Sequence, residues 1–301
     1  MQKLRISVVK YANTAPLVWS FLHGPLAGKY DLSFTVPSQC ADALRVGAAD
    51  IAIIPAIEYQ RIPNMVVLPD LAIASQNRVR SLLIVSKEPI EQVRSMALDS
   101  SSRSTQALTR ILAAEHWKIT PEFFEAEPDL IAMLDKADAA MIIGDPALRL
   151  SVAIEKKSTV SLQGRGICQA DALGIPRNEI FHIYDVVGEW RKFTNLPAVM
   201  AIWAGRPGLV TPQVVADFTA SRAFGLSQIP AISQAAAREL DLPPAVLESY
   251  LRQNIDFSLG EDNRRGLERY FHEAAKLGLI PREKKIAWAS ATKETTPVSV
   301  K

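Results

Sequence analysis

The chain has 301 residues, of which 48% are hydrophobic and 22% charged, and its formal net charge is +2. This balance is typical of a globular protein with one large or two smaller domains, and so small a charge argues against nucleic-acid or membrane-surface partners. No stretch approaches the roughly 18 consecutive apolar residues that span a bilayer, and the start, MQKLRISVVKY, lacks the pattern of a secretory signal. Cys40 and Cys168 have no disulfide or metal-ligand spacing and suit a reducing compartment. We therefore expect a cytoplasmic protein.

The first half of the chain alternates short apolar runs with helical patterns, which is typical of βαβ units. The pattern predicts strands over Arg5–Val9, Leu32–Val36, Ile51–Pro55, Ser81–Val85, Ser95–Leu98, Phe123–Glu125 and Ala140–Ile143. It predicts helices between them over Pro16–Leu22, Gln39–Val46, Thr105–His116 and Pro128–Leu134. The last third reads as helical, over Thr211–Leu226, Pro244–Asn254 and Arg264–Leu277. Thr211-Pro212 is a good start signal, with the threonine as N-cap and the proline in the first turn.

Two parts of the chain resemble each other in the order of their predicted elements. RISVVKYANTAPLVWSFL (5–22) and SMALDSSSRSTQALTRIL (95–112) both read as strand, polar turn and helix, with Ser104-Thr105 in the place of Asn13-Thr14. The segments 34–56 and 124–147 then share the order strand, helix, Ala-Asp and apolar strand. The resemblance predicts two similar α/β lobes, each a mostly parallel sheet flanked by helices.

Such a pair of lobes implies a particular place for a ligand. We expect lobe 1 to comprise residues 1–84 and 200–301 and lobe 2 residues 85–199, with hinge strands near 79–86 and 196–204. Loops at the carboxyl ends of parallel strands gather at one edge of each sheet, and ligands bind there. If the two edges face each other, the ligand site is the cleft between the lobes.

Metal and nucleotide chemistry have little support in the sequence. The four histidines are scattered, and no histidine or cysteine pair has the spacing of metal ligands. The chain has no Walker or Rossmann glycine pattern and no nucleophile-elbow motif. We therefore expect neither a metal nor a nucleotide cofactor.

Small polar residues at strand ends are the remaining candidates. Asn13-Thr14 either caps the following helix or faces a ligand, with Thr14 the better cap and Asn13 the better ligand contact. In LDSSSRSTQAL (98–108), Ser102, Arg103, Ser104 and Thr105 stand where a helix begins. Free N–H groups and a partial positive charge at such an N-terminus suit a carboxylate, although a solvated serine-rich cap reads the same way.

Two more strand-end positions belong to this set. Ser38 stands at the start of the helix predicted after the second strand. Asp145 follows the strand predicted over Ala140–Ile143 and either orients a ligand hydroxyl or caps the next turn. The residues alone thus predict a two-lobed α/β protein that closes on a small anionic ligand, and they leave open whether it transforms that ligand.

Six segments, taken in order, resemble the chorismate dehydratase family of the futalosine route to menaquinone. They are VVKYANTAPLVW, VPSQCADALRVGAADIAIIPAIEY, NRVRSLLIVS, LDSSSRSTQAL, IIGDPAL and YDVVGEWRKFTNLPAVMAIW. The resemblance covers roughly residues 5 to 205 and implies the type II periplasmic-binding-protein fold. It also implies that dianionic chorismate loses water to give 3-[(1-carboxyvinyl)oxy]benzoate, without a cofactor.

The resemblance also implies roles for single residues. Asn13 and Ser81 would be the catalytic positions, with Asn13 as a hydrogen-bond donor because an amide is no strong base at neutral pH. Ser102, Ser104 and Thr105 would hold a carboxylate, and Gly144 and Asp145 would lie on the opposite loop. The chain departs from the family pattern at Ala12, Ala15 and Asn77, and in the order of its Ser104-Thr105 pair.

Two other functions remain open at this level. One is the later enzyme of the same route, which makes 1,4-dihydroxy-6-naphthoate, although its opening motif and catalytic histidine have no evident counterpart here. The other is a solute-binding or sensor protein that binds an aromatic carboxylate without turnover. The proton acceptor is open as well: the substrate's own enolpyruvyl carboxylate would serve as an internal base, which is a hypothesis.

Overall fold

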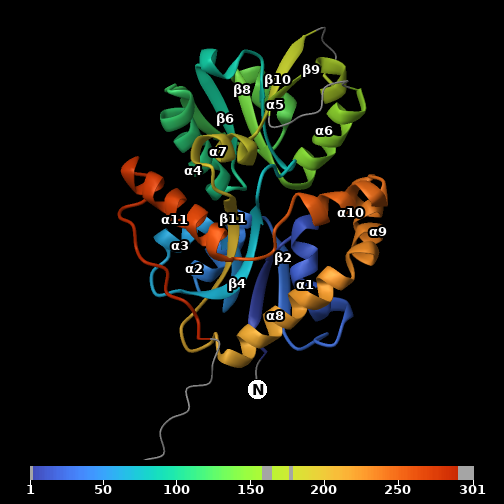
Figure 1. The fold of residues 1–301 in the computed structure, drawn as a ribbon, viewed down its shortest axis with the longest axis vertical. Coiled ribbons are helices and arrows are strands. Elements are labelled where there is room, and N and C mark those ends of the chain that lie inside the picture. Colours follow the sequence, from blue (N-terminus) through green and yellow to red (C-terminus); the bar gives the residue numbers. More distant parts are fainter. Residues whose placement is uncertain (1–2, 158–164, 176–178, 291–301) are drawn as a thin grey trace, which may run out of the picture.

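Two β-sheets form the centres of two lobes in the computed structural model, which describes residues 3–157, 165–175 and 179–290 (Figure 1). The first sheet contains, in spatial order, β2 (Asp31–Thr35), β1 (Arg5–Val9), β3 (Ile51–Pro55), β11 (Ala198–Gly205) and β4 (Val66–Ser75). The second contains β7 (Glu122–Ala126), β6 (Ser95–Asp99), β8 (Ala139–Ile143), β5 (Leu82–Ser86), β10 (Ile180–Asp185) and β9 (Arg165–Gln169). We call the two halves lobe 1 and lobe 2.

The first five strands of the second sheet match those of the first sheet in order, which agrees with the internal resemblance in the sequence, and β9 extends the second sheet. β1 pairs in parallel with β2 and β3, and β6 pairs in parallel with β7 and β8. On the far side of each sheet, β11 lies antiparallel between β3 and β4, and β5 lies antiparallel between β8 and β10. The carboxyl ends of β1, β3, β6 and β8 are thus equivalent positions in the two lobes.

The expectation of mostly parallel sheets needs correction, because both sheets are mixed. Only the four pairings of β1 and β6 are parallel among the described strands, and the pairings of β5, β10 and β11 are antiparallel. The physical reason lies in the connections: β5 and β11 are entered from the other lobe and not through a local helical crossover, so nothing requires them to run parallel.

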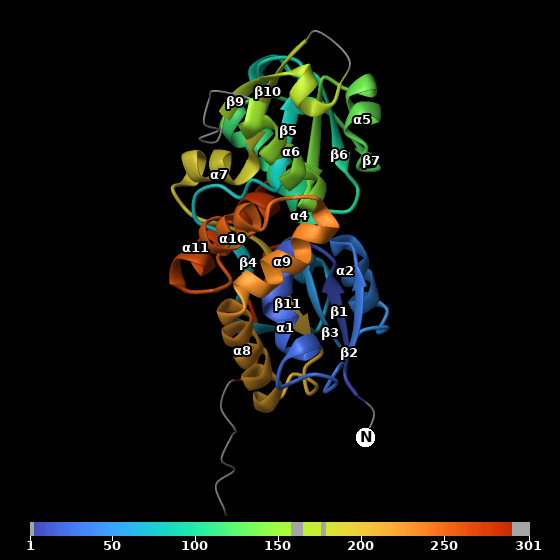
Figure 2. The ribbon, with the colours of Figure 1, turned by 90° about the vertical axis from the view of Figure 1, so that its right-hand side faces the viewer.

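Helices flank both sheets (Figure 2). Lobe 1 has α1 (Ala15–His23), α2 (Pro37–Arg45), α3 (Ala56–Arg61), α8 (Pro212–Ser227), α9 (Ile229–Leu240), α10 (Pro244–Gln253) and α11 (Glu261–Lys276). Lobe 2 has α4 (Arg103–Ile111), α5 (Leu130–Lys136), α6 (Gly144–Lys157) and α7 (Val186–Thr194). In both views α10 and α11 lie at the level where the lobes meet.

The chain passes between the sheets twice. It leaves β4 at Ser75 and enters β5 at Leu82, and it returns from α7 to β11 across residues 195–197. Because β5 belongs to the second sheet and β11 to the first, the expected boundaries at residues 84 and 200 fall within strands. The division of the chain by residue number stays a prediction.

The last helices return to lobe 1 and pack closely on it. Thr211 Oγ1 accepts a hydrogen bond from Val214 N at 3.3 Å, which confirms the N-cap read from the sequence. Ser221 Oγ in α8 donates to Leu17 O at 2.8 Å. A Cβ on Gly225 would lie 1.8 Å from Pro16 O, so only glycine allows α8 to approach α1 this closely.

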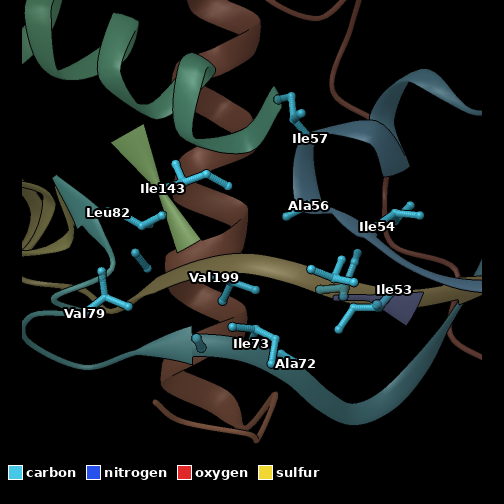
Figure 3. Packing of buried hydrophobic residues seen from close by; sticks show 14 of the residues in the cluster. Ile53, Ile54, Ala56, Ile57, Ala72, Ile73, Val79, Leu82, Ile143 and Val199 are labelled. Carbon is cyan, nitrogen blue, oxygen red and sulfur yellow. The ribbon is translucent and has the colours of Figure 1, made fainter. Parts of the chain in front are cut away.

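One hydrophobic core extends through both lobes. Figure 3 shows a part of it in which Ile53 and Ile73 come from the first sheet, and Leu82 and Ile143 from the second. A smaller cluster, which includes Phe181, packs against the other face of the second sheet. None of the helices in the described ranges is long and apolar enough to cross a membrane.

Candidate active site

A cavity lies where the carboxyl ends of the central strands of both lobes meet. It measures about 490 Å³ when the space at its open mouth is included. Its apolar wall includes Ile53, Ile73, Val79, Leu82 and Ile143, all visible in Figure 3. The polar residues of its lining are Tyr11, Asn13, Thr14, Ser81, Ser102 and Thr105. Gly144 also lines the cavity, directly against the ring of Tyr11.

The turn after β1 presents Asn13 to this cavity. Residues 12–14 form one tight helical turn, closed by the hydrogen bond from Thr14 N to Tyr11 O at 3.0 Å. Thr14 occupies the N-cap position of α1, but its side chain makes no capping hydrogen bond, so the expected capping role is wrong. Thr14 Oγ1 instead donates to Asn13 Oδ1 at 3.3 Å. This contact turns the NH₂ group of Asn13, a pair of donors, away from Thr14.

The equivalent turn after β6 is capped in the ordinary way. Ser102 Oγ accepts a hydrogen bond from Thr105 N at 3.4 Å and lies 2.8 Å from Thr105 Oγ1. Asp99 supports the turn from behind, because its Oδ1 accepts from Ser101 N at 2.9 Å and from Ser101 Oγ at 2.6 Å. Burial raises the pKa of Asp99 above its ordinary value, and these donors oppose that rise. The first turn of α4 therefore meets the cavity in a fixed geometry.

Ser81 lies on the first crossing between the lobes and is almost completely buried. Its Oγ accepts a hydrogen bond from Tyr250 Oη at 2.8 Å, and its carbonyl accepts from Gly144 N at 2.8 Å. The side chain lines the cavity between the two turns. Ser81 is thus held from both sides while its hydroxyl borders the ligand space.

Tyr11 and Gly144 close the cavity from opposite lobes. Gly144 has φ = +70°, and a Cβ there would lie 2.6 Å from Cζ of Tyr11, so the ring lies directly on the glycine backbone. Tyr11 Oη lies 3.5 Å from Ser101 Oγ. Burial raises the pKa of Tyr11 to about 12, so its hydroxyl stays protonated at neutral pH.

Asp145 lies behind the cavity wall and joins the lobes through the backbone. Its Oδ1 accepts a hydrogen bond from Ala12 N in the first turn at 3.1 Å. Burial raises the pKa of this carboxyl to about 6, although the hydrogen bond from Ala12 opposes the rise. The side chain thus orients the turn that carries Asn13. This role differs from the two expected ones, which were to orient a ligand hydroxyl or to cap the following turn.

Three other expected site residues also lie outside the cavity lining. Ser38 N donates to Ser101 O at 3.0 Å, and Ser104 Oγ accepts from Ile57 N at 3.2 Å. Arg103 donates to both carboxylate oxygens of Asp42 at 2.9 Å and to Glu58 at 3.3 Å. All these contacts join α4 or its preceding loop to lobe 1, and the direct contact of Ser38, Arg103 and Ser104 with a ligand stays a prediction.

Several residues in or beside the cavity lining were not predicted from the sequence. Tyr11 could have been included because it begins the turn of Asn13. Tyr250, which bonds to Ser81, lies 169 residues away in a helix with only an amphipathic pattern. Met200 and Ala201 reach the cavity from β11, where the sequence shows an ordinary apolar strand.

The electrostatics of the wall favour an anion, although the lining lacks a charged group. Among the described residues that line the cavity, none is Asp, Glu, His, Lys or Arg. The helices α1, α2, α4 and α6 all begin at or beside lining residues, which are Thr14, Pro37, Ser102 and Gly144. The N-terminal end of a helix carries partial positive charge, which favours a bound anion. No group of three or more potential metal ligands occurs within the described parts of the chain.

Two mixed sheets with an interlobe cavity define the type II periplasmic-binding-protein fold. Solved structures share it: an Archaeoglobus fulgidus protein has a TM-score of 0.70 at 17% identity, covering 92% of this chain and 98% of its own. The periplasmic aliphatic sulphonate binding protein of Escherichia coli has a TM-score of 0.58 at 15% identity, covering 99% and 97%. These likenesses show the fold alone.

The family model described as menaquinone biosynthesis matches residues 4–276, and the chain belongs to this family. A curated relative, the chorismate dehydratase of Thermus thermophilus, is 28% identical over 283 residues, which cover 93% of this chain and 98% of the relative. The family expected from the sequence is thus confirmed.

Proposed function

We propose that the protein is a chorismate dehydratase, a cofactor-free hydro-lyase that converts chorismate to 3-[(1-carboxyvinyl)oxy]benzoate and water in menaquinone biosynthesis. The family and the Thermus thermophilus relative support this activity. The observation that carries it is the cavity wall, which offers hydrogen-bond donors and helix N-termini but no acidic or basic side chain among its described residues. Such a wall suits a dianion whose own reactivity supplies much of the driving force.

The reaction needs little from the protein beyond position and hydrogen bonds. The C–H bond breaks on the ring carbon that bears the enolpyruvyl ether, and its electron pair forms the third ring double bond. The C–O bond to the hydroxyl on the adjacent ring carbon breaks at the same time. The proton and the hydroxide leave as water, so no oxidant or reductant takes part. Charge also develops on the departing hydroxyl, where preorganised donors stabilise the transition state more than the substrate.

The turn after β6 fits the ring carboxylate. Ser102 and Thr105 present hydroxyls at the N-terminus of α4, and both line the cavity. Charge-assisted hydrogen bonds of this kind are stronger than those between neutral groups. We assign Ser102 and Thr105 to substrate binding, and Thr14 and Gly144 to the shape of the opposite wall.

Asn13 and Ser81 fit the reacting edge of the ring. Each borders the cavity with a donor, and a donor near the departing hydroxyl stabilises the charge that the oxygen gains. The lining provides no carboxylate as a base, which supports the hypothesis that the enolpyruvyl carboxylate of the substrate accepts the ring proton. This route would balance the proton within the substrate itself.

The test is to incubate purified protein with chorismate and to identify the product by mass and NMR. We expect an aromatic product that is lighter than chorismate by one water. Binding without consumption would instead indicate a sensor, and neither binding nor consumption would reject the proposal. Chorismate deuterated at the transferred position should react more slowly when chemistry limits turnover, and equal rates would argue against rate-limiting proton removal.

A further inference from the structure

We propose that Tyr250 is a positioning residue for the dehydration, which acts by fixing the hydroxyl of Ser81 so that Ser81 donates to the substrate. The inference rests on the proposed function. Tyr250 lies in α10, outside the cavity lining, and no motif in the sequence singles it out.

The hydrogen-bond geometry sets the direction of the Ser81 proton. Tyr250 Oη donates to Ser81 Oγ at 2.8 Å, so the serine oxygen acts as acceptor toward the tyrosine. A hydroxyl has one hydrogen to donate, and that of Ser81 must therefore point elsewhere. Since Ser81 lines the cavity, the direction left for its donation is the ligand space.

The chemistry of Tyr250 suits a permanent donor better than a proton source. It is 1% exposed, and burial raises its pKa well above the ordinary value of a tyrosine. A phenol that stays protonated donates to Ser81 throughout the reaction. Donation to a hydroxyl polarises it and strengthens the hydrogen bond that it donates in turn. Ser81 therefore stabilises the departing hydroxyl more strongly with Tyr250 than without it.

The backbone of Ser81 is fixed separately, by a residue from the other lobe. Asp185, at the end of β10, accepts hydrogen bonds from Arg80 N at 2.7 Å and from Val79 N at 3.1 Å. Arg80 has φ = 65°, a conformation that few non-glycine residues adopt without such support. Lobe 2 thus holds the backbone of Ser81, while α10 of lobe 1 holds its side chain.

The chain offers a matched control in Tyr270 of α11. It is also buried, and its hydroxyl donates to Ser104 O at 3.0 Å, so it too joins a C-terminal helix to the other lobe. It does not line the cavity. Tyr270→Phe removes a similar buried hydrogen bond without touching Ser81, which separates positioning from general stability.

The experiment compares steady-state kinetics of the wild type, Tyr250→Phe and Tyr270→Phe with chorismate. We expect Tyr250→Phe to lower kcat by about 10- to 100-fold with little change in KM, because the missing donor acts mainly on the departing hydroxyl. Tyr270→Phe should keep kcat near the wild-type value while its thermal midpoint falls at least as far. Equal losses of kcat in the two variants, or an unchanged kcat in Tyr250→Phe, would overturn the inference.

A double-mutant cycle with Ser81→Ala gives the second readout. If Tyr250 acts through Ser81, the double variant should be no slower than Ser81→Ala alone, whereas independent contributions would multiply. Multiplied losses would overturn the inference. An inactive wild type would reject the proposed function itself, and an active wild type with a fully active Tyr250→Phe would reject only the role of Tyr250.

Discussion

The turns that follow β1 and β6 occupy equivalent places in two matching sheets, but they use their polar groups differently. After β6, Ser102 caps α4 and its hydroxyl lies beside that of Thr105, so the turn satisfies much of its own hydrogen bonding. After β1, Thr14 leaves α1 without a side-chain cap and donates to Asn13 instead. The turn after β1 therefore lacks a side-chain cap, which usually stabilises a helix by about 1 kcal/mol, and it keeps an oriented amide at the cavity.

The contacts between the lobes show the same asymmetry. Ser104 and Arg103, beside the capped turn, bind Ile57, Asp42 and Glu58 of lobe 1. The uncapped turn is held mainly through its backbone, by Asp145 on Ala12. The difference suggests two separate roles in the proposed reaction. The turn after β6 in lobe 2 closes the cavity and holds the anion, and the turn after β1 in lobe 1 presents the reacting donor.

Asn13→Ala removes the proposed reacting donor from the turn after β1 and should have the largest effect of the substitutions considered. We expect kcat to fall on the order of 100- to 1,000-fold, as when a preorganised donor is removed from a transition-state charge. The thermal midpoint should stay close to that of the wild type, since Asn13 makes no capping bond. Thr14→Val, which only releases the Asn13 amide, should show a smaller loss; near-wild-type turnover of Asn13→Ala would refute its catalytic role.

Gly144→Ala tests whether the cavity depends on the close contact between Tyr11 and the loop after β8. The added methyl both strains the backbone at φ = +70° and displaces the Tyr11 ring, so we expect kcat/KM to fall about 10- to 100-fold and stability by about 1–3 kcal/mol. Gly174→Ala is the control, because Gly174 has φ = +71° but no atom within 4 Å of the added Cβ. If both variants lose the same activity, the Tyr11 contact has no special role. Urea unfolding supplies the stability of each.

Thr105→Val tests the binding side of the comparison. Loss of one hydrogen bond to a buried charged group should weaken chorismate binding by roughly 1–3 kcal/mol with little change in the rate at saturation. Thr109→Val makes the same change on a buried residue one turn along α4, outside the cavity lining, and should bind normally. Calorimetry with the product as ligand gives both affinities, and equal values for the two variants would remove Thr105 from the site.

Arg103→Met tests closure and should give the smallest effect. Arg103 joins the lobes through Asp42 and the buried Glu58, whereas Arg45 pairs with the same two carboxylates from within lobe 1. We expect KM to rise about 3- to 10-fold in Arg103→Met, because partly buried charged hydrogen bonds contribute about 1 kcal/mol to the closed form. Arg45→Met removes an equal charge without cutting the connection. A larger rise in KM in Arg45→Met would contradict the role of Arg103 in closure.

The sequence located the polar turns because strand ends and helix starts have local signals. The bounds predicted for β1 and β3 agree with the structure, and Asn13, Ser102 and Thr105 all border the cavity. These positions follow from alternation, caps and the rule that ligands bind at the carboxyl ends of parallel strands.

The remainder depends on contacts between distant segments, which a single sequence does not encode locally. The sequence predicted a ligand contact for Arg103, but it could not predict that Arg103 pairs with Asp42 and Glu58 of the other lobe. Tyr250 meets Ser81 only after α10 has packed across the first crossing. The same reason applies to β4 and β10, which were not expected and which pair with the distant strands β11 and β5.

The most direct test of these two roles is a single-turnover measurement with a saturating excess of protein over chorismate, which follows the loss of the diene absorbance. Under saturation, weakened binding no longer limits the signal, and only the chemical step is compared. The account predicts that Thr105→Val decays at close to the wild-type rate, whereas Asn13→Ala binds chorismate and decays on the order of 100-fold more slowly or not at all. Decay of Asn13→Ala at the wild-type rate, or a slower decay in Thr105→Val than in Asn13→Ala, would contradict it.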